Sequence, residues 1–244
     1  MFLDRTWADD DVRRVLDVCC GTGLMTAELV QRGLDVVGVD ASPEMLERAR
    51  GLLGPAVPLE IAVLPSLPVD EPFDAAVSTL DGLNYLDLPD FTASMVAVHD
   101  VLRPGGWFIF DLHAEAALDL MRENPVLSGE QDGSRFVLTS TVDDVTRACT
   151  TVIDFTAADP VASFTETHVQ YVHSDDDVRA ALDAAGLDVV RVTDEYTDSP
   201  VAEWSLRASW VTRRPTRGPS SSCCCGVSTW AAATSCRCSS CARN

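Results

Sequence analysis

The first half of the chain alternates between short apolar runs and segments whose apolar residues recur at helical spacing. The apolar runs predict strands at residues 15–19, 35–39, 58–63, 73–79 and 107–112. The helical spacing predicts helices over 22–32, 42–53 and 91–102, and Ser42 and Pro43 are typical of a helix start. We expect a sharp break at Pro104-Gly105-Gly106, directly before the fifth strand. Alternating strands and helices predict a parallel sheet covered by helices on both faces.

From about residue 134 the pattern changes to an alternation of apolar and polar positions without intervening helices. It predicts three antiparallel strands, at 135–142, 148–155 and 161–172. A helix over 174–185 follows, with Ser174 as N-cap and Gly186 after its end, and then two closing strands at 187–193 and 205–213. We therefore expect one α/β domain formed by residues 1–128 and 174–214. Residues 129–173 would be an inserted antiparallel lid over the substrate.

The charge of the chain narrows the choice of partners. All 38 acidic residues lie at or before Glu203, and 15 of the 18 basic residues lie at or before Arg214, so residues 1–214 carry a formal charge of −23. Such a negative field repels phosphate backbones and makes nucleic acid an unsuitable partner. No apolar run approaches the ~18 residues that cross a bilayer, and no signal-peptide pattern opens the chain. We expect a cytoplasmic protein without membrane association.

The last 30 residues have a different composition. Residues 215–244 hold six of the nine cysteines and no acidic residue. Three interpretations stay open: a metal site built from these cysteines, a disulfide framework, or a shifted reading frame of GC-rich DNA. We favour the third, because three adjacent cysteines chelate a metal poorly and no paired Cys-x-x-Cys knuckle is present. It predicts a disordered tail and no bound metal.

A turn follows the first predicted strand, where ligands bind in parallel α/β sheets because free N–H groups of the next helix point there. Gly21 and Gly23 let the backbone approach a ligand closely, and Asp40 at the end of the second strand can accept hydrogen bonds from ribose hydroxyls. A dinucleotide site would carry a third glycine where Thr26 stands. A nicotinamide-dependent oxidoreductase is therefore the alternative, weakened further because the chain has no lysine for a Tyr-x-x-x-Lys pair.

Four segments together resemble the class I S-adenosylmethionine-dependent methyltransferases: DVCCGTG (17–23), VVGVDAS (36–42), FDAAVS (73–78) and VLRPGGWFIFD (101–111). The resemblance covers residues 15 to about 214. STLDGLNYL (78–86) and FTETH (164–168) are similar to bacterial small-molecule methyltransferases with a β insertion after the fifth strand. The resemblance implies a three-layer Rossmann-like fold with a mainly parallel seven-stranded sheet, whose last strand runs antiparallel. It implies methyl transfer from S-adenosylmethionine to a small molecule, with an amine preferred over a hydroxyl.

The resemblance also implies which residues hold the cofactor. Asp17 and the backbone of the turn would line its methionyl part, Asp40 its ribose, and Leu64 its adenine. The positions carried over are Asp17, Cys19, Cys20, Gly21, Thr22, Gly23, Asp40, Ala41, Leu64 and Leu80. Two departures from the family pattern predict an open pocket or weaker affinity: Val63 stands where many relatives have Asp, and only residues 1–14 precede the first strand. A binding protein that has lost its activity is a further alternative.

Candidate chemistry lies after the fourth and fifth strands and in the insertion. An amine acceptor need only lose a proton, whereas a hydroxyl needs a general base. The catalytic candidates are His113, His168 and Glu166, and the substrate-binding candidates are Asp81, Asn84 and Tyr85. Each also has a structural interpretation, as a helix cap, a polar cross-strand pair or a packing residue. Cys19 and Cys20 are predicted to fill space rather than to act as nucleophiles, because no histidine accompanies them. Homodimerisation stays open.

Overall fold

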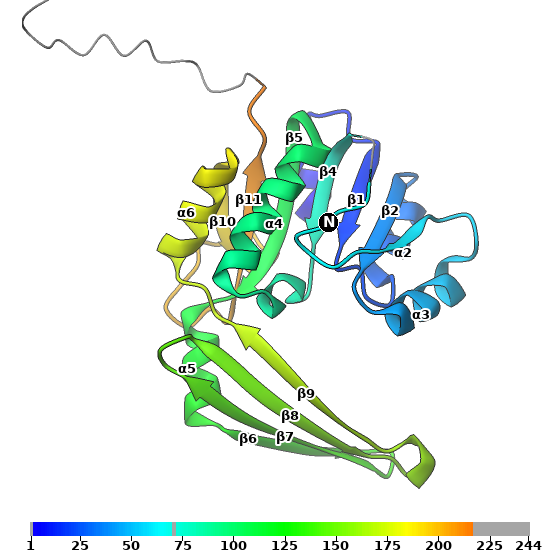
Figure 1. Cartoon of the computed structure of the whole chain (residues 1–244), viewed down its shortest axis with the longest axis vertical. Helices are drawn as coiled ribbons and strands as arrows, with labels where there is room; N and C mark the ends of the chain where they lie inside the picture. Colours follow the sequence, from blue (N-terminus) through cyan, green and yellow to red (C-terminus); the bar gives the residue numbers. More distant parts are fainter. Residues whose placement is uncertain (1, 70–71, 217–244) are drawn as a thin grey trace, which may run out of the picture.

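The structure is a computed structural model that describes residues 2–69 and 72–216. The expected disorder of the cysteine-rich tail and its alternative metal or disulfide sites fall on residues 217–244, outside the described part. The structure has two sheets, and the larger one carries the domain (Figure 1).

The larger sheet has seven strands in the order β10-β11-β5-β4-β1-β2-β3. Their bounds are Arg14–Val18 (β1), Asp35–Asp40 (β2), Leu59–Ile61 (β3), Phe73–Ser78 (β4), Leu102–His113 (β5), Asp188–Asp194 (β10) and Arg207–Arg213 (β11). Strands β1 to β5 pair in parallel, and β11 runs antiparallel to both of its neighbours, β5 and β10. The predicted α/β class and the antiparallel last strand are confirmed.

Helices cover both faces of this sheet. Those packed on it are α1 (Phe2–Thr6), α2 (Leu24–Gln31), α3 (Pro43–Leu53), α4 (Leu88–Val101) and α6 (Asp175–Ala185). Helix α5 (Glu115–Glu123) follows β5, and two 3₁₀ turns are η1 (Gly82–Tyr85) and η2 (Pro160–Ala162). Successive residues of a strand point to opposite faces. In β5, Phe108 joins the core beneath α4 and α6, whereas Ile109 joins the core beneath α1 and α2. The sheet and the helices on its two faces therefore form three layers. The predicted N-caps are confirmed, because Ser42 and Ser174 accept the N–H groups of Met45 and Asp177.

The smaller sheet projects away from the domain between α5 and α6 (Figure 1). Its four antiparallel strands are β6 (Val126–Gln131), β7 (Ser134–Asp143), β8 (Ala148–Thr156) and β9 (Phe164–Tyr171). The prediction of three strands is wrong, since β6 is added. That strand is almost wholly exposed and shows no apolar alternation, so only its pairing with β7 reveals it. Strand β9 also begins later than predicted, because residues 160–162 form η2.

The predicted break at Pro104-Gly105-Gly106 is wrong, because these residues lie within β5. Leu102 pairs with Phe73 and Trp107 pairs with Ala75, so residues 103–106 bulge opposite the single residue Asp74. Gly105 has a φ of 82°, a left-handed conformation that favours glycine. Its N–H donates to the carbonyl of Arg214 at 2.8 Å. The two glycines therefore let the strand bulge without losing its partner at the end of β11.

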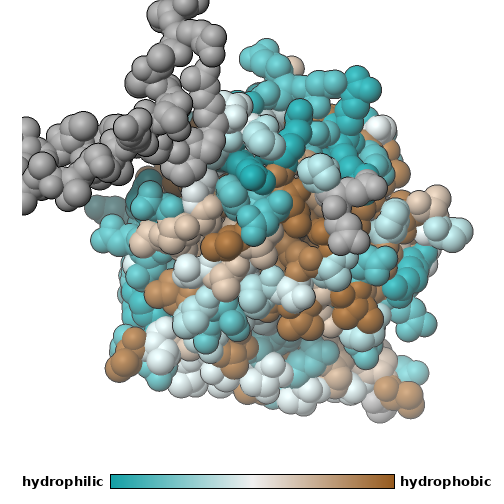
Figure 2. Space-filling model, turned by 45° about the horizontal axis from the view of Figure 1, so that its top comes forward, coloured by the Kyte–Doolittle hydropathy of each residue, from teal (hydrophilic) through white to brown (hydrophobic). Residues whose placement is uncertain are grey.

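The surface carries exposed large apolar side chains. On the face drawn in Figure 2, brown and teal residues are interspersed, with the brown ones mainly across the middle. Leu80, Val63 and Leu24 are about two thirds exposed, and all three lie at or after the carboxyl ends of strands in the larger sheet. None of the described helices is both long enough and apolar enough to cross a bilayer.

Candidate functional site

The turn after β1 is shaped by two glycines in left-handed conformations. Gly23 (φ 81°) precedes α2, and a Cβ there would lie 2.9 Å from Leu53 and 3.1 Å from Ala49, so this glycine lets α2 approach α3. Gly21 (φ 54°) faces open space, since a Cβ built on it meets no atom within 4 Å. The turn therefore has one glycine for packing and one that leaves room for a ligand. Thr22 lies between them, half-buried.

Asp17 is fully buried in β1, directly beneath this turn. Its Oδ2 accepts a 2.5 Å hydrogen bond from the Thr26 hydroxyl, whereas its Oδ1 has no partner among the described residues. Burial raises the pKa of Asp17 to about 7, because a charged carboxylate loses its hydration there. A buried oxygen without a described partner can accept a hydrogen bond from a polar ligand atom.

Asp40 holds the turn from the end of β2. Its Oδ2 accepts the N–H of Gly21 and its Oδ1 accepts the N–H of Ser42, both at 2.8 Å. Each carboxylate oxygen keeps a second lone pair, and the side chain is half-buried rather than enclosed. Asp40 can therefore accept two further hydrogen bonds from hydroxyl groups above the sheet edge.

Cys19 and Cys20 serve as packing residues next to glycines. A Cβ on Gly82 would lie 2.5 Å from the Cβ of Cys19, and a Cβ on Gly38 would lie 3.1 Å from the sulfur of Cys20. Burial raises the pKa of Cys19 to about 12 and raises that of Cys20 as well. The raised pKa values favour protonated thiols at neutral pH, which supports the predicted packing role over a nucleophilic one.

The apolar positions predicted near the adenine and the methionyl group lie along the same edge. Leu64 follows β3 and is half-buried against the core, Ala41 is exposed after β2, and Leu80 follows β4 with a φ of 63°. Leu80 is 65% exposed, which is unusual for a leucine at the heart of a sheet edge and leaves its side chain available for a ligand.

A cavity of about 640 Å³ opens between the edge of the larger sheet, helix α5 and the inner face of the smaller sheet. We call it the acceptor cavity. Its lining includes five positions singled out from the sequence, namely Leu80, Asp81, Tyr85, His113 and His168. The fold thus brings together residues up to 88 positions apart in the chain, as a substrate site requires.

Tyr85, His168 and Glu166 form a hydrogen-bonded chain at one side of the cavity. The hydroxyl of Tyr85 lies 2.8 Å from Nδ1 of His168, and Nε2 of His168 lies 3.3 Å from Glu166. An ionised carboxylate only accepts, so His168 donates from Nε2 and Nδ1 accepts from Tyr85. Burial and the charges of Asp81 and Glu166 raise the pKa of Tyr85. The phenol stays neutral, and its oxygen lone pairs can accept from a substrate.

His113 and Asp81 form a second group, held by Arg207 of β11. Arg207 binds both oxygens of Asp81, at 2.9 and 2.8 Å, and Nε2 of His113 lies 3.3 Å from Oδ1. Burial works against ionisation of Asp81, but His113 and Arg207 outweigh it and lower its pKa. An ionised Asp81 fixes the proton of His113 on Nε2. Nδ1 is then a buried acceptor without a partner among the described residues.

The loop that carries Asp81 is held from below by Asp111, a buried carboxylate in β5. Asp111 accepts the N–H groups of Leu80 and Asp81 at 2.7 and 2.8 Å, and the hydroxyl of Tyr196. Leu80 and Asp81 are consecutive non-glycine residues with positive φ, a strained arrangement that such contacts must maintain. Burial raises the pKa of Asp111 despite these donors.

Asn84 was predicted to contact the substrate, but the structure places it elsewhere. Its side chain is fully buried, its Nδ2 donates to the carbonyl of Tyr171 at 2.7 Å, and its Oδ1 accepts the N–H of His113 at 3.1 Å. Both ends of the amide are thus used by backbone groups. Asn84 ties η1 to β9 and β5 and so positions the cavity without lining it. His113 does not cap α5 either, because the N-cap is Ala114.

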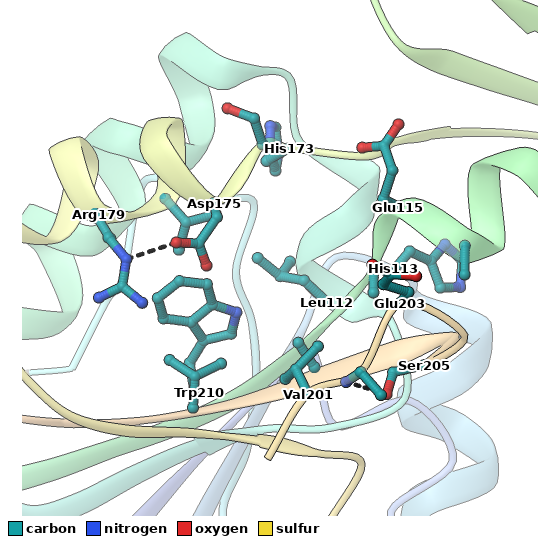
Figure 3. A pocket seen from close by; sticks show the side chains of 17 residues that line it. Leu112, His113, Glu115, His173, Asp175, Arg179, Val201, Glu203, Ser205 and Trp210 are labelled. Carbon is teal, nitrogen blue, oxygen red and sulfur yellow. Dashed lines mark hydrogen bonds and ion pairs between the residues drawn. The ribbon is translucent and has the colours of Figure 1, made fainter.

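A second cavity, of about 470 Å³, lies on the other side of His113 (Figure 3). Leu112 and Trp210 form its floor, between Arg179 and Asp175 on one side and Glu203 on the other (Figure 3). Arg179 donates to Asp175 at 2.6 Å. Only His113 of the predicted site residues lines it, so the acceptor cavity is the one that the sequence points to.

Arg207 and Asp111 are site residues that sequence reasoning missed. Asp111 had a signal, because a carboxylate in the apolar run WFIFDL is unexpected in a buried strand. Arg207 had none, since an arginine at the start of an exposed-looking strand is ordinary. Among the described residues, no group of three or more His, Cys, Asp or Glu side chains has the geometry of a metal site.

Comparisons of the sequence with known proteins find methyltransferases. Residues 15–106 match the model of a family described as "Methyltransferase domain". YqeM of Bacillus subtilis (strain 168), a protein named as a methyltransferase, is 28% identical over 200 residues, which cover 80% of this chain and 81% of YqeM. The nicotinamide-dependent alternative is not supported by these matches.

Two solved structures share the fold. A S-adenosylmethionine-dependent methyltransferase from Clostridium acetobutylicum ATCC 824 superposes with a TM-score of 0.80 at 24% identity, covering 88% of this chain and 89% of that one. The sugar N-methyltransferase KedS8 from Streptoalloteichus sp ATCC 53650 gives a TM-score of 0.67 at 23% identity, covering 87% and 83%. At these identities the likeness establishes the fold.

Proposed function

Since the chain belongs to the class I S-adenosylmethionine-dependent methyltransferases, we propose that it methylates an amine of a small molecule held in the acceptor cavity. The observation that carries this proposal is the cavity itself, which adjoins Leu80 at the carboxyl end of β4 and gathers Tyr85, His113 and His168 around one space. The sugar N-methyltransferase KedS8, with the same fold, supports an amine as the acceptor group.

The residues at the edge of the larger sheet fit the cofactor. Gly21 leaves open space above the turn, Asp40 has lone pairs for the two ribose hydroxyls, and Asp17 has an unpartnered oxygen beneath. When bound there, S-adenosylmethionine supplies an activated methyl group on a sulfonium. The task left to the protein is to place a nucleophile in line with that group, at about 3 Å.

Two groups in the cavity can hold the amine and take up its proton. The lone pairs of the Tyr85 oxygen can accept an N–H, because the hydroxyl proton is already donated to His168. Nδ1 of His113 is a buried acceptor without a partner among the described residues, because Asp81 holds the proton on Nε2. A neutral amine loses one proton as its nitrogen gains the methyl group, and either histidine can receive it. Glu166 and Asp81 then stabilise the resulting imidazolium.

The cofactor half of the proposal is tested by thermal unfolding with S-adenosylmethionine, S-adenosylhomocysteine or NAD⁺. A ligand at 100 times its Kd adds about 2.7 kcal/mol of stability, so the first two should raise the Tm and NAD⁺ should not. Asp40→Ala should abolish most of the rise. Stabilisation by NAD⁺ alone would contradict the proposal.

The acceptor half is tested with radiolabelled methyl transfer to a panel of amines and alcohols. Because either histidine can receive the proton, His113→Ala and His168→Ala should each lower kcat/KM, and the double variant should lower it by about 10²-fold, the lower end of what a positioned base contributes. Val169→Ala is the matched control, because Val169 neighbours His168 in β9 and, by strand alternation, points to the opposite face. Unchanged rates in both histidine variants would remove the proposed proton acceptors.

A further inference from the structure

The inner face of the smaller sheet is divided into an apolar row and a polar row. Leu127 of β6 lies opposite Leu138 of β7, which lies opposite Ile153 of β8. One step nearer the larger sheet, Ser140 lies opposite Thr151, which lies opposite His168. Side chains directly across a sheet from each other point to the same face, and all six line the acceptor cavity.

Helix α5 adds apolar surface across the cavity from this sheet. Leu120 and Met121 line it, and Leu120 is 46% exposed. Leu127 is 61% exposed although it points into the cavity. Large apolar side chains that stay exposed inside a cavity gain free energy when an apolar ligand covers them. The cavity therefore has an apolar end, between α5 and the apolar row, and a polar end at Tyr85 and His113.

Positive charge is missing from the lining. In the part of the chain that the structure describes, no arginine lines the acceptor cavity, and the chain has no lysine. Arg207 lies just behind it, but both of its contacting nitrogens bind Asp81. Arg122 of α5 and Arg147, directly before β8, are paired as well, Arg122 with Asp119 and Asp144, and Arg147 with Glu115.

Two carboxylates lie near the cavity: Asp81 is bound by Arg207, and Glu166 is hydrogen-bonded to His168. Glu166 ends the apolar row opposite Ile153, and Asp81 lines the polar end. A phosphate or carboxylate in this space would lose water without gaining an unpaired cation, and it would lie near the carboxylate of Glu166. A protonated amine, by contrast, is attracted on arrival, and the negative field of residues 1–214 acts in the same direction.

We propose that the acceptor is a lipophilic amine that carries no phosphate or carboxylate group, with its apolar part between α5 and the row Leu127, Leu138 and Ile153. Its amine lies at Tyr85 and His113. This inference rests on the proposed methylation of an amine and names the class of molecule that the same cavity accepts.

The test measures binding to the full chain by calorimetry in the presence of S-adenosylhomocysteine, so that no turnover is needed. The probes are matched pairs: octylamine with 8-aminooctanoate, and phenethylamine with phenylalanine. The member without a carboxylate should bind at least tenfold more tightly in each pair. Butylamine and glucosamine should bind more weakly than octylamine, because each buried methylene strengthens binding by up to about fourfold. Equal binding within the pairs, or binding of neither member, would overturn the inference.

The second measurement uses a variant with a positive charge placed in the polar row. Ser140 lies in the polar row, and its hydroxyl contacts Thr151 at 3.0 Å. Ser140→Arg should reverse the order within each pair by at least tenfold, whereas Ser140→Gln, of similar length but uncharged, should keep it. An unchanged order in Ser140→Arg would mean that charge does not decide what the cavity accepts.

The two proposals fail in different ways. Absence of methyl transfer to every amine, with the discrimination in binding intact, would overturn amine methylation and leave the description of the cavity standing. Methylation of 8-aminooctanoate and phenylalanine as fast as their partners would leave amine methylation standing and overturn the class of acceptor named here.

Discussion

Because Asp17 is buried, the stability of the folded protein should depend on pH, and the size of this effect can be worked out from the structure. The pKa of this fully buried carboxyl is raised from 3.8 to about 7 in the folded protein. The folded state therefore holds the proton more tightly than the unfolded state, so the protein loses stability as pH rises from about 4 to about 7. At 1.36 kcal/mol per pKa unit, the loss reaches roughly 4 kcal/mol above pH 7.

Asp17→Asn removes this dependence, because an amide has no proton to lose while its oxygen still accepts from Thr26. The stability of the variant relative to the unsubstituted protein should rise by about 1.4 kcal/mol per pH unit between pH 5 and 7 and then level off. Urea unfolding without cofactor at pH 5, 6, 7 and 8.5 measures it. Asp183→Asn, at an exposed position of α6, is the matched control and should show no such rise. A difference that does not change with pH would refute the reasoning.

Three further predictions concern the supports of the site. Asn84→Ala leaves two buried backbone groups without partners and should cost about 2–4 kcal/mol in urea unfolding, whereas an exposed Asn-to-Ala change should cost far less. Cys19 and Cys20 should react with a thiol reagent at pH 8 at least 100-fold more slowly than in the unfolded chain, as followed by peptide mass spectrometry; rapid labelling would contradict the packing role. Arg207→Gln removes a charge that lowers the pKa of Asp81, so the acid limb of kcat/KM should move to higher pH. Arg207→Lys should move the limb back toward its original position, and an unmoved limb in Arg207→Gln would contradict the role of Arg207 at Asp81.

The parts of the fold that the sequence predicts are those with strong local signals. Ser42, Ser174 and Gly186 mark helix ends through their own hydrogen bonding and backbone freedom, and each does so in the structure. Strand β6 escapes because its sequence, VLSGEQ, has no apolar alternation and the strand forms by pairing with β7. The Pro-Gly-Gly segment was misjudged because its usual turn signal is overridden by pairing with the end of β11. Long-range pairing is not encoded in a local pattern.

The same contrast between local signals and long-range contacts holds for the residues of the candidate site. Gly21, Asp17 and Asp40 are recognisable because one short turn and the next strand end place them together. Asn84 was misplaced because its neighbours in the sequence do not reveal that Tyr171 and His113 surround it. Arg207 was missed for a related reason, since its contact with Asp81 joins residues 126 positions apart. Residues that hold other residues are the hardest to find from sequence alone.

The position of β11 has a consequence for how the protein is made. The last strand that the structure describes, β11, sits between β10 and β5, and it brings Arg207 to Asp81. On the ribosome, residues 1–113 emerge first and contain the turn, Asp17, Asp40 and the whole parallel part of the sheet. The edge of β5 stays open until residue 213 has been synthesised, at roughly 5–20 residues per second. For about 5–20 seconds, a nascent chain therefore has the elements of the proposed cofactor site but not the arginine that binds Asp81 in the proposed acceptor site.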